Sequence, residues 1–506
     1  MRGILAELPE TLDATYERIL QEIPKSNQVH AHRLLQCLTV ASRPLRVKEL
    51  AEVLAVDLSA SDGIPKLNEA LRWEDQEQAV LSACSSLIAV IEGDDEDKNS
   101  RVVQFSHFSV KEFLASDRLA TSKIDASRYH HILLGPAHTI MAQACLSVLL
   151  RFTSHFDEAE FKNFPLAKYA AESFGDHAEF EGVLLHIRDG VDRLLDADTS
   201  HFAAWVWMRP HIPLSPLYHL HTPRPRWLDV IPLFYVAARG YSGLVDYLIS
   251  KRPEDMNVRG HYGTSLHAAL EGGHADVARL LLGHCPDVDV RDYEDQTPLH
   301  LAADHGFLSV TRTLVECNAD INVRDNVGNT PLHRTMTWWY QRSENDQDCH
   351  LDVAKFLLEH GADPDAKNVY YETPLHRASF NGSVKGTQLM LEHGASIHAR
   401  TKKGRTPLHR TLDGAHYDFY TLFLDTTRCL LEHGADVDAL DDEHATSLHL
   451  ASVYDNVKGA RLLLEHGANV RLEDKKGRTP FQIASERGRE EIMQLLSEHL
   501  QSQQNM

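Results

Sequence analysis

The sequence predicts a mainly α-helical chain in which a helix-and-hairpin domain and a helical connector precede a solenoid of about eight stacked repeats. Three observations support this fold class. A short Thr-Pro-Leu-His phrase recurs along the C-terminal half at nearly constant spacing. The N-terminal part lacks the phrase and combines helical patterns with two short apolar runs. A chain of 506 residues also exceeds what one hydrophobic core usually organises.

The recurring phrase sets the period of the repeats. Its copies begin at Thr264, Thr297, Thr330, Thr373, Thr406, Thr446 and Thr479, after a degenerate first copy at Ile231. Most successive starts are 33 residues apart, and two intervals are longer, at 43 and 40 residues. A fixed period of this length is typical of solenoids, in which each repeat is one small structural unit.

Each repeat is predicted to form two short helices. The threonine offers its hydroxyl as an N-cap, and the proline after it takes the first helical position, where its missing N–H costs nothing. We expect the histidine of the phrase to form a hydrogen bond near the helix start. A second helix follows, for example 353–359, and closes on an LEHGA phrase whose histidine lies favourably near the helix C-terminus.

The second helices end where a left-handed backbone is needed, and glycine accepts that conformation without strain. Asn318 suits the same position, whereas Cys285 suits it less well. The glycines at this position are Gly361, Gly394, Gly434 and Gly467.

Two short helices cannot bury their apolar face alone, so the copies must stack. The phrases and their period are similar to those of the ankyrin-repeat family over residues 231–500, with 501–506 as a tail. The family usually places a glycine just before the threonine, but Asp295, Tyr371 and His444 stand there in three copies. We expect reshaped hairpin tips at those copies.

Two repeats are longer than the others. About ten extra residues lie near 338–349 and seven near 414–426, and they either lengthen helices and loops or form a binding feature. The second interpretation rests on three adjacent aromatic residues, because exposed aromatic clusters are common binding hot spots. These residues are Trp338, Trp339 and Tyr340.

Residues 1–125 form a separate domain by pattern. Helices are expected near 8–20, 31–41, 47–55 and 78–86, followed by apolar runs at 87–91 and 102–105 that flank the acidic tip 94–97. Ser109 and Glu112 are spaced as a capping box for the next helix. Helices followed by a hairpin make a winged-helix arrangement.

Three phrases in this domain resemble the winged-helix segment of fungal NACHT–ankyrin signalling proteins: LPETLDATYERIL (8–20), RPLRVKELAEVLAVD (43–57) and VQFSHFSVKEFLAS (103–116). FPLAKYAAESFGDHA (164–178) resembles the helical connector of the same proteins, here spanning 126–230. The resemblance implies a regulatory part of a switching ATPase, in which the winged helix contacts an upstream nucleotide-binding module.

The ATPase chemistry itself is not expected in this chain. A P-loop needs the dipeptide Gly-Lys, which occurs nowhere in the sequence. The chain is therefore either a stand-alone protein or a fragment of a nucleotide-switched ATPase whose P-loop module lies upstream. A third alternative is a winged-helix DNA binder, which is disfavoured because the segment 75–86 lacks Lys and Arg and the net charge is −22.

No catalytic, metal-binding or cofactor-binding residues are expected. The 32 histidines fall mostly in the repeat phrases, and no zinc-protease spacing, nucleophile elbow or paired cysteine motif accompanies the others. Seven scattered cysteines indicate a reducing compartment, and no apolar stretch is long enough to span a membrane. We expect a soluble, cytoplasmic, non-enzymatic protein that binds neither nucleic acid nor membranes.

The partner-binding residues are expected at the hairpin tips, which together with the first helices form a concave surface in the ankyrin family. The tips differ in character while the scaffold stays constant, as a recognition surface requires. We expect charge reversal at Lys402, Lys403 and Arg405 to weaken partner binding without unfolding the stack. Besides these and the aromatic cluster, the predicted contacts are Tyr293, Glu294, Tyr370, Tyr371, Asp441, Asp442 and Glu443.

Overall fold

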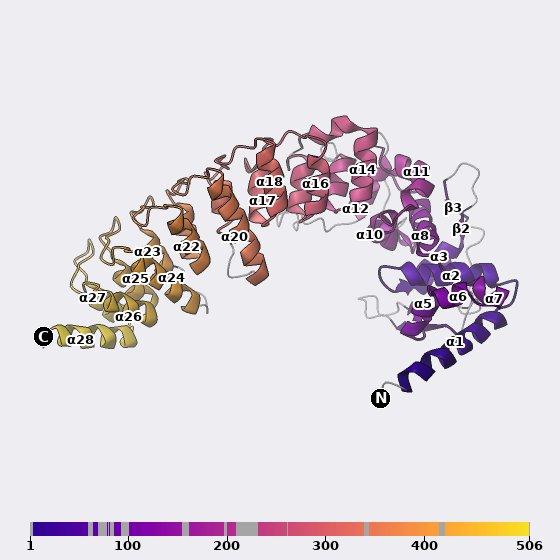
Figure 1. The fold of residues 1–506 in the computed structure, drawn as a ribbon, viewed down its shortest axis with the longest axis horizontal. Helices are drawn as coiled ribbons and strands as arrows, with labels where there is room; N and C mark the ends of the chain where they lie inside the picture. The colour runs from indigo at the N-terminus through magenta and orange to yellow at the C-terminus, as the bar shows by residue number, and fades with distance from the viewer. Residues whose placement is uncertain are drawn as a thin grey trace. The chain divides into compact units, whose positions relative to one another are not determined.

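The structure is a computed structural model, and it places the chain in two compact units, Met1–Asp255 and Met256–Met506. It is mainly helical, as the sequence predicts (Figure 1). The division falls after the first predicted repeat. The residues that the structure describes are 4–58, 64–68, 78, 80, 86–92, 101–153, 161–196, 200–208, 231–260, 262–337, 344–413 and 420–504.

A winged-helix domain opens the first unit. The predicted hairpin is confirmed, since Ile88 pairs with Phe105 and Glu92 pairs with Arg101 in an antiparallel sheet of order β1-β5-β4. The acidic tip 94–97 and most of the helix predicted at 78–86 lie outside the described residues. The elements are α1 (Ile4–Glu22), α2 (Gln28–Val40), β1 (Leu45–Arg46), α3 (Val47–Leu54), β2 (Val56–Asp57), β3 (Lys66–Leu67), β4 (Ile88–Glu92), β5 (Arg101–Phe105) and α5 (Phe108–Leu114).

The capping box predicted at Ser109 and Glu112 is wrong. Helix α5 begins earlier, at Phe108, and its N-cap is His107, whose Nδ1 accepts a hydrogen bond from the backbone N–H of Ser109. The Ser109 hydroxyl instead lies 2.9 Å from the Tyr16 hydroxyl of α1. The same hydroxyl lies 2.6 Å from Nδ1 of His107, so Ser109 contacts the capping residue instead of capping the helix itself.

Helix α10 connects the winged helix to the first repeat within this unit. On one side, the buried Glu52 carboxylate of α3 accepts the Leu166 N–H at 2.8 Å. On the other side, the Glu179 carboxylate accepts the N–H groups of Gly243 and Leu244 at 2.8 and 2.9 Å, which caps α14. The elements are α6 (Asp117–Ala120), α7 (Asp125–Arg128), α8 (Leu134–Leu149), α10 (Ala167–Ala178), α11 (Val183–Leu194), α12 (Ser200–Met208), α13 (Pro232–Ala238) and α14 (Ser242–Lys251).

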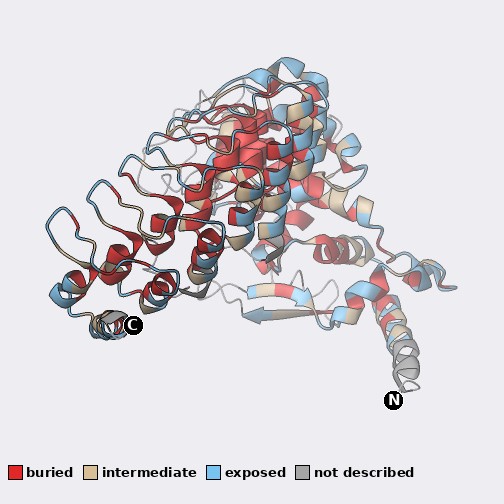
Figure 2. Ribbon diagram, turned by 60° about the vertical axis from the view of Figure 1, so that its left-hand side comes forward, coloured by how far each residue is buried: buried red, intermediate tan, exposed pale blue. Residues whose placement is uncertain are grey.

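The second unit is a stack of two-helix repeats. The first helices pack in one row, α15-α17-α19-α21-α23-α25-α27, and the second helices pack in another, α16-α18-α20-α22-α24-α26-α28. Figure 2 shows buried residues concentrated in the helices and exposed residues along the loops at the edge of the stack. Leu299, Leu332 and Leu375 follow the Thr-Pro pair and are fully buried, as their position in the phrase predicts.

The first helices are mostly seven residues long, and the second helices follow them closely. The bounds are η4 (Pro253–Asn257), α15 (Ser265–Glu271), α16 (Ala275–Leu282), α17 (Pro298–Asp304), α18 (Leu308–Glu316), α19 (Pro331–Arg334), α20 (Glu344–Glu359), α21 (Pro374–Phe380), α22 (Val384–Glu392), α23 (Pro407–Asp413), α24 (Tyr420–Glu432), α25 (Ser447–Tyr454), α26 (Val457–Glu465), α27 (Pro480–Glu486) and α28 (Glu490–Gln504).

The extra residues of the two long repeats lengthen their second helices. Helix α20 has 16 residues and α24 has 13, whereas α22 and α26 have nine each. The described part of both insertions therefore agrees with the simpler interpretation, a longer helix. Trp338, Trp339 and Tyr340 lie outside the described residues.

Left-handed backbone recurs where the second helices end. Gly361, Gly394, Gly434 and Gly467 end the second helices with φ between 83° and 97°, as predicted. Cys285 and Asn318 adopt the same conformation, at φ 53° and 65°. Cβ makes this region costly for any residue other than glycine, by about 1–2 kcal/mol.

The strain at Cys285 gives a first prediction. Cys285→Gly removes the Cβ that opposes the left-handed backbone, so it should raise the free energy of unfolding by about 1 kcal/mol. Urea unfolding followed by circular dichroism measures the change. Cys285→Ala is the matched control, because it removes the thiol but retains the Cβ; equal stabilisation by Ala and Gly would contradict the backbone explanation.

Candidate functional site

The hairpin tips share one hydrogen-bonded frame. The first residue of each tip anchors it through a side-chain oxygen, which accepts the backbone N–H groups two and four residues later at 2.8–3.4 Å. An acceptor at this place satisfies two turn donors at once. The anchors are Asp292, Asp325, Asn368, Thr401, Asp441 and Asp474.

Each tip is also bonded to the one before it. The backbone N–H of Lys402 donates to the Tyr370 carbonyl at 2.8 Å, and that of Asp442 donates to the Lys403 carbonyl at 3.0 Å. Equivalent bonds run from Asn326, Val369 and Lys475 to the preceding tips. Neighbouring tips are thus held side by side, and their exposed side chains form one continuous surface.

The reshaping predicted for the tips without glycine is wrong. Asp295, Tyr371 and His444 have φ of 57°, 58° and 57°, the left-handed conformation that Gly328 and Gly404 adopt at 76° and 72°. The anchor and the bonds to the next tip hold the backbone in this shape whichever residue occupies the position. The side chains of these three residues are exposed.

The histidine of each phrase bonds both to the start of its own helix and to the next repeat. Its Nδ1 accepts the N–H of the threonine three residues earlier, at 3.0–3.2 Å, which completes a capping box in which histidine takes the place usually held by Glu or Gln. Its Nε2 lies 3.0–3.2 Å from a backbone carbonyl of the next repeat. The predicted bond at the helix start is confirmed. These six residues are His267, His300, His333, His376, His409 and His449.

This geometry requires a neutral imidazole. An amide N–H can only donate, so Nδ1 must be the acceptor and the ring proton must lie on Nε2, where it donates to the carbonyl. Burial favours the same form: it lowers the pKa of His267, His300 and His376 to about 4 and that of His333 to about 3. Burial also lowers the pKa of His409 and His449.

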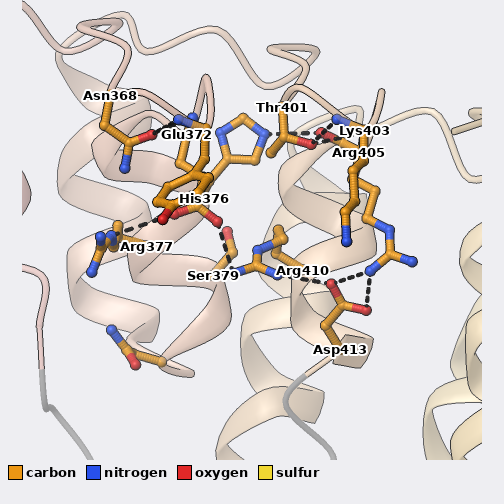
Figure 3. A network of polar contacts seen from close by, with 12 residues as sticks. Asn368, Glu372, His376, Arg377, Ser379, Thr401, Lys403, Arg405, Arg410 and Asp413 are labelled. Atoms are coloured by element: carbon orange, nitrogen blue, oxygen red, sulfur yellow. Dashed lines mark hydrogen bonds and ion pairs between the residues drawn. The ribbon is translucent and has the colours of Figure 1, made fainter. Parts of the chain in front are cut away.

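An ion-pair network covers the first helices of three successive repeats. Arg334 pairs with Asp325 at 2.6 Å, and Arg410 pairs with Glu372 and Asp413 at 2.8 Å each. Figure 3 shows Arg377, Glu372, Arg410, Asp413 and Arg405 joined in sequence across α21 and α23. Burial, reinforced by the charges of Arg334 and Arg410, lowers the pKa of Arg377, although Glu372 opposes the shift. The three guanidinium groups are therefore close enough to repel one another.

This row of arginines is absent from the predictions above, although a pattern in the sequence indicates it. The residue after the histidine is Arg334, Arg377 or Arg410 in three consecutive copies, whereas the other copies place an apolar residue there. Equivalent positions of stacked repeats lie side by side, so identical charged residues in successive copies predict a row.

Most predicted contact residues are exposed at the tips. The exposed fractions of Tyr293, Tyr370 and Tyr371 are 43%, 57% and 53%. Lys402, Lys403, Asp442 and Glu443 are exposed as well, and Glu294 is half-buried. The structure brings Tyr370, Tyr371, Lys402 and Lys403 together on adjoining tips. Their role in partner binding stays a prediction.

Two predicted contact residues have structural partners. Asp441 is buried and anchors its tip, and it also lies 3.4 Å from Arg405. Arg405 is half-buried and donates two bonds to Asp413, at 2.5 and 2.6 Å. Charge reversal at Arg405 would place three carboxylates together, so a test of binding should alter only the lysines.

Other kinds of site receive no support from the described residues. Over those residues, no group of three or more His, Cys, Asp or Glu side chains is arranged to hold a metal ion. Within the same part of the chain, no helix is both long and apolar enough to cross a bilayer.

The stacked two-helix units, with their constant hydrogen-bonded frame and variable exposed tips, define a repeat protein. Comparison with known families agrees. The model for ankyrin repeats (3 copies) matches residues 233–325, 342–429, 400–474 and 423–506, together more than half of the chain. The chain belongs to the ankyrin-repeat family. Residues 16–124 match a second model, described as GPI inositol-deacylase, winged helix domain.

A similar curated protein is "Azaphilone pigments biosynthesis cluster protein L" from Monascus ruber. It is 33% identical over 303 residues, which cover 56% of this chain. The chain spans 61% of that relative's length.

The six bridging histidines predict a dependence of stability on pH. Burial holds their folded-state pKa below the ordinary value of 6.5, so the unfolded chain takes up protons first as the pH falls. The stability that they contribute is complete above about pH 6.5 and is lost progressively toward pH 4. For one histidine the loss should be on the order of 2 kcal/mol. Urea unfolding between pH 7.5 and 4.5 measures it.

His300→Gln supplies the control. Gln482 stands at the equivalent position of the last repeat, and its side-chain oxygen accepts the Thr479 N–H at 2.8 Å. Glutamine does not titrate in this range, so the variant should lose less stability than the parent between pH 6.5 and 4. An unchanged pH profile in His300→Gln would remove this histidine from the explanation.

Proposed function

We propose that the chain is a non-enzymatic sensor or adaptor that binds a protein partner through the concave surface of its ankyrin repeats. One observation carries the proposal: tips with the same backbone frame present different exposed side chains. Tyr293, Tyr370, Lys402 and Glu443 occupy the variable part of four such tips. The anchors that hold the frame are buried, except for the half-buried Thr401, so the exposed residues can differ without changing the stack.

We infer further that the chain is the regulatory half of a fungal NACHT–ankyrin signalling system that acts in the cytoplasm. The resemblance of residues 8–20, 43–57 and 103–116 supports this, together with the winged-helix match over residues 16–124. In such a system the winged helix contacts a nucleotide-binding module, and the repeats sense the partner. Helix α10 is suited to connect the two, since it contacts both α3 through the Leu166 N–H and α14 through Glu179.

Site-specific photo-crosslinking tests partner binding at the tips. A photoreactive amino acid is placed at Tyr293, Lys402 or Glu443 in the full chain, and at Glu392 and Glu465, which are exposed at the ends of α22 and α26, as matched controls. In extracts of the source organism, tip positions should give a discrete protein adduct and the control positions should not. Equal adducts at tip and control positions would contradict the proposed surface.

A nucleotide-binding assay tests whether this chain lacks the ATPase function. Because the sequence contains no Gly-Lys dipeptide, isothermal titration of this chain with Mg·ATP should give no saturable heat. The fluorescent analogue of ATP used in parallel should stay free in solution. Stoichiometric ATP binding would contradict a purely protein-binding role.

A further inference from the structure

Two adjoining tips form an exposed patch of apolar and basic side chains. This tyrosine–lysine patch consists of Val369, Tyr370, Tyr371, Lys402 and Lys403. The two tips are joined by the bond from the Lys402 N–H to the Tyr370 carbonyl at 2.8 Å. The exposed fractions of Val369, Tyr370 and Tyr371 are 47%, 57% and 53%. Three large side chains exposed side by side are uncommon on a surface that binds nothing.

The backbone at Tyr371 adds an independent indication. Its φ is 58°, in the region where a bulky residue is strained and where Gly328 and Gly404 stand in the neighbouring tips. More than half of the side chain is exposed, and its aromatic ring contacts only the Lys367 ammonium, at 6.0 Å, among the contacts described for it. Glycine would make a more stable tip, so a tyrosine here indicates a function outside folding.

The lysines of the patch differ from the arginines on the first helices, which are paired with acidic side chains. On the first helices, Arg377 and Arg410 are neutralised by Glu372 and Asp413. No ion pair within the described residues engages the side chain of Lys402 or Lys403, and both are exposed. The patch therefore presents two uncompensated positive charges next to two aromatic rings.

We propose that the tyrosine–lysine patch binds an extended acidic segment of a protein partner that carries an aromatic or large aliphatic side chain between its carboxylates. The proposal rests on the proposed function and names the partner's chemistry. The apolar side chain would cover the rings of Tyr370 and Tyr371, and the flanking carboxylates would accept hydrogen bonds from the two ammonium groups.

A polypeptide fits this surface better than a nucleic acid. The next tip carries Asp442 and Glu443, both exposed, and it is bonded directly to the lysine tip through the Asp442 N–H. A phosphate backbone carries a charge on every nucleotide and would be repelled there, whereas a peptide can confine its carboxylates to the lysines. The net charge of −22 acts in the same direction.

Fluorescence anisotropy with the full chain tests the proposal. The probe is a labelled synthetic peptide of about twelve residues in which Glu and Asp flank a central Phe-Leu pair; a second peptide has Ser for Phe-Leu, and a third has Lys for the acids. A single-stranded oligonucleotide of equal charge is the fourth ligand. We expect saturable binding of the first peptide, at least tenfold tighter than that of the other three.

The variants separate the patch from general charge. K402E/K403E should weaken binding of the first peptide at least tenfold, with unchanged thermal unfolding. Tyr370→Ser with Tyr371→Gly should weaken it severalfold without lowering the temperature of thermal unfolding, because glycine removes the backbone strain at position 371. The matched control is K475E/K476E, two exposed lysines at the same position of the last tip. It should change the affinity less than twofold.

Three outcomes would overturn the proposal. Absence of binding, equal loss in both lysine variants, or oligonucleotide binding as tight as that of the peptide would each exclude the stated ligand. Photo-crosslinks at Tyr293 would then show that the proposed function stands while the patch assignment fails. If the tip positions also give no crosslinks, the proposed function fails with it.

Discussion

The stack of repeats depends on the histidine of each phrase, because each of its two ring nitrogens makes a hydrogen bond to the backbone. In His300, Nδ1 holds the start of its own helix and Nε2 holds the Asn329 carbonyl of the next repeat. The two bonds require opposite protonation of the two nitrogens, and only the neutral ring supplies both. The same side chain thus holds the start of its own helix and the backbone of the next repeat. The long insertions leave this bridge intact, since His333 reaches Glu372 and His409 reaches Ala445 across them.

The same constraint explains what differs at the two ends of the repeat array. Gln482 replaces the histidine in the most C-terminal repeat of this sequence, where its side-chain oxygen accepts the N–H of its own Thr479. In the first repeat, Phe234 stands at the histidine position and is buried, so this copy has no such bridge to offer. It is held instead by α10, through the Glu179 carboxylate at the start of α14. The division between the two compact units falls after this copy, at Asp255.

The sequence predicted those features that are local to one repeat. The threonine cap, the proline after it, the glycines of the second helices and the hairpin of the winged helix all follow from short-range patterns. What it could not predict depends on neighbours distant in sequence. The second bond of each histidine, to a carbonyl of the next repeat, and the ion pair between Arg405 and Asp441 both need the stacked structure. The contact between the hydroxyls of Ser109 and Tyr16 likewise joins residues that are 93 positions apart.

The reshaping expected at Asp295, Tyr371 and His444 fails for a reason that bears on function. The left-handed backbone costs about 1–2 kcal/mol at each of them, yet each tip keeps its anchor bonds and its bond to the neighbouring tip. The tips therefore keep the same backbone with Asp, Tyr or His at that position as with glycine. Tolerance does not explain why glycine is absent, because glycine would remove the strain and the three side chains are exposed. A residue that costs stability and packs little is most simply explained by what it presents to solvent, and at Tyr371 that is an aromatic ring on the tip next to the exposed Lys402 and Lys403.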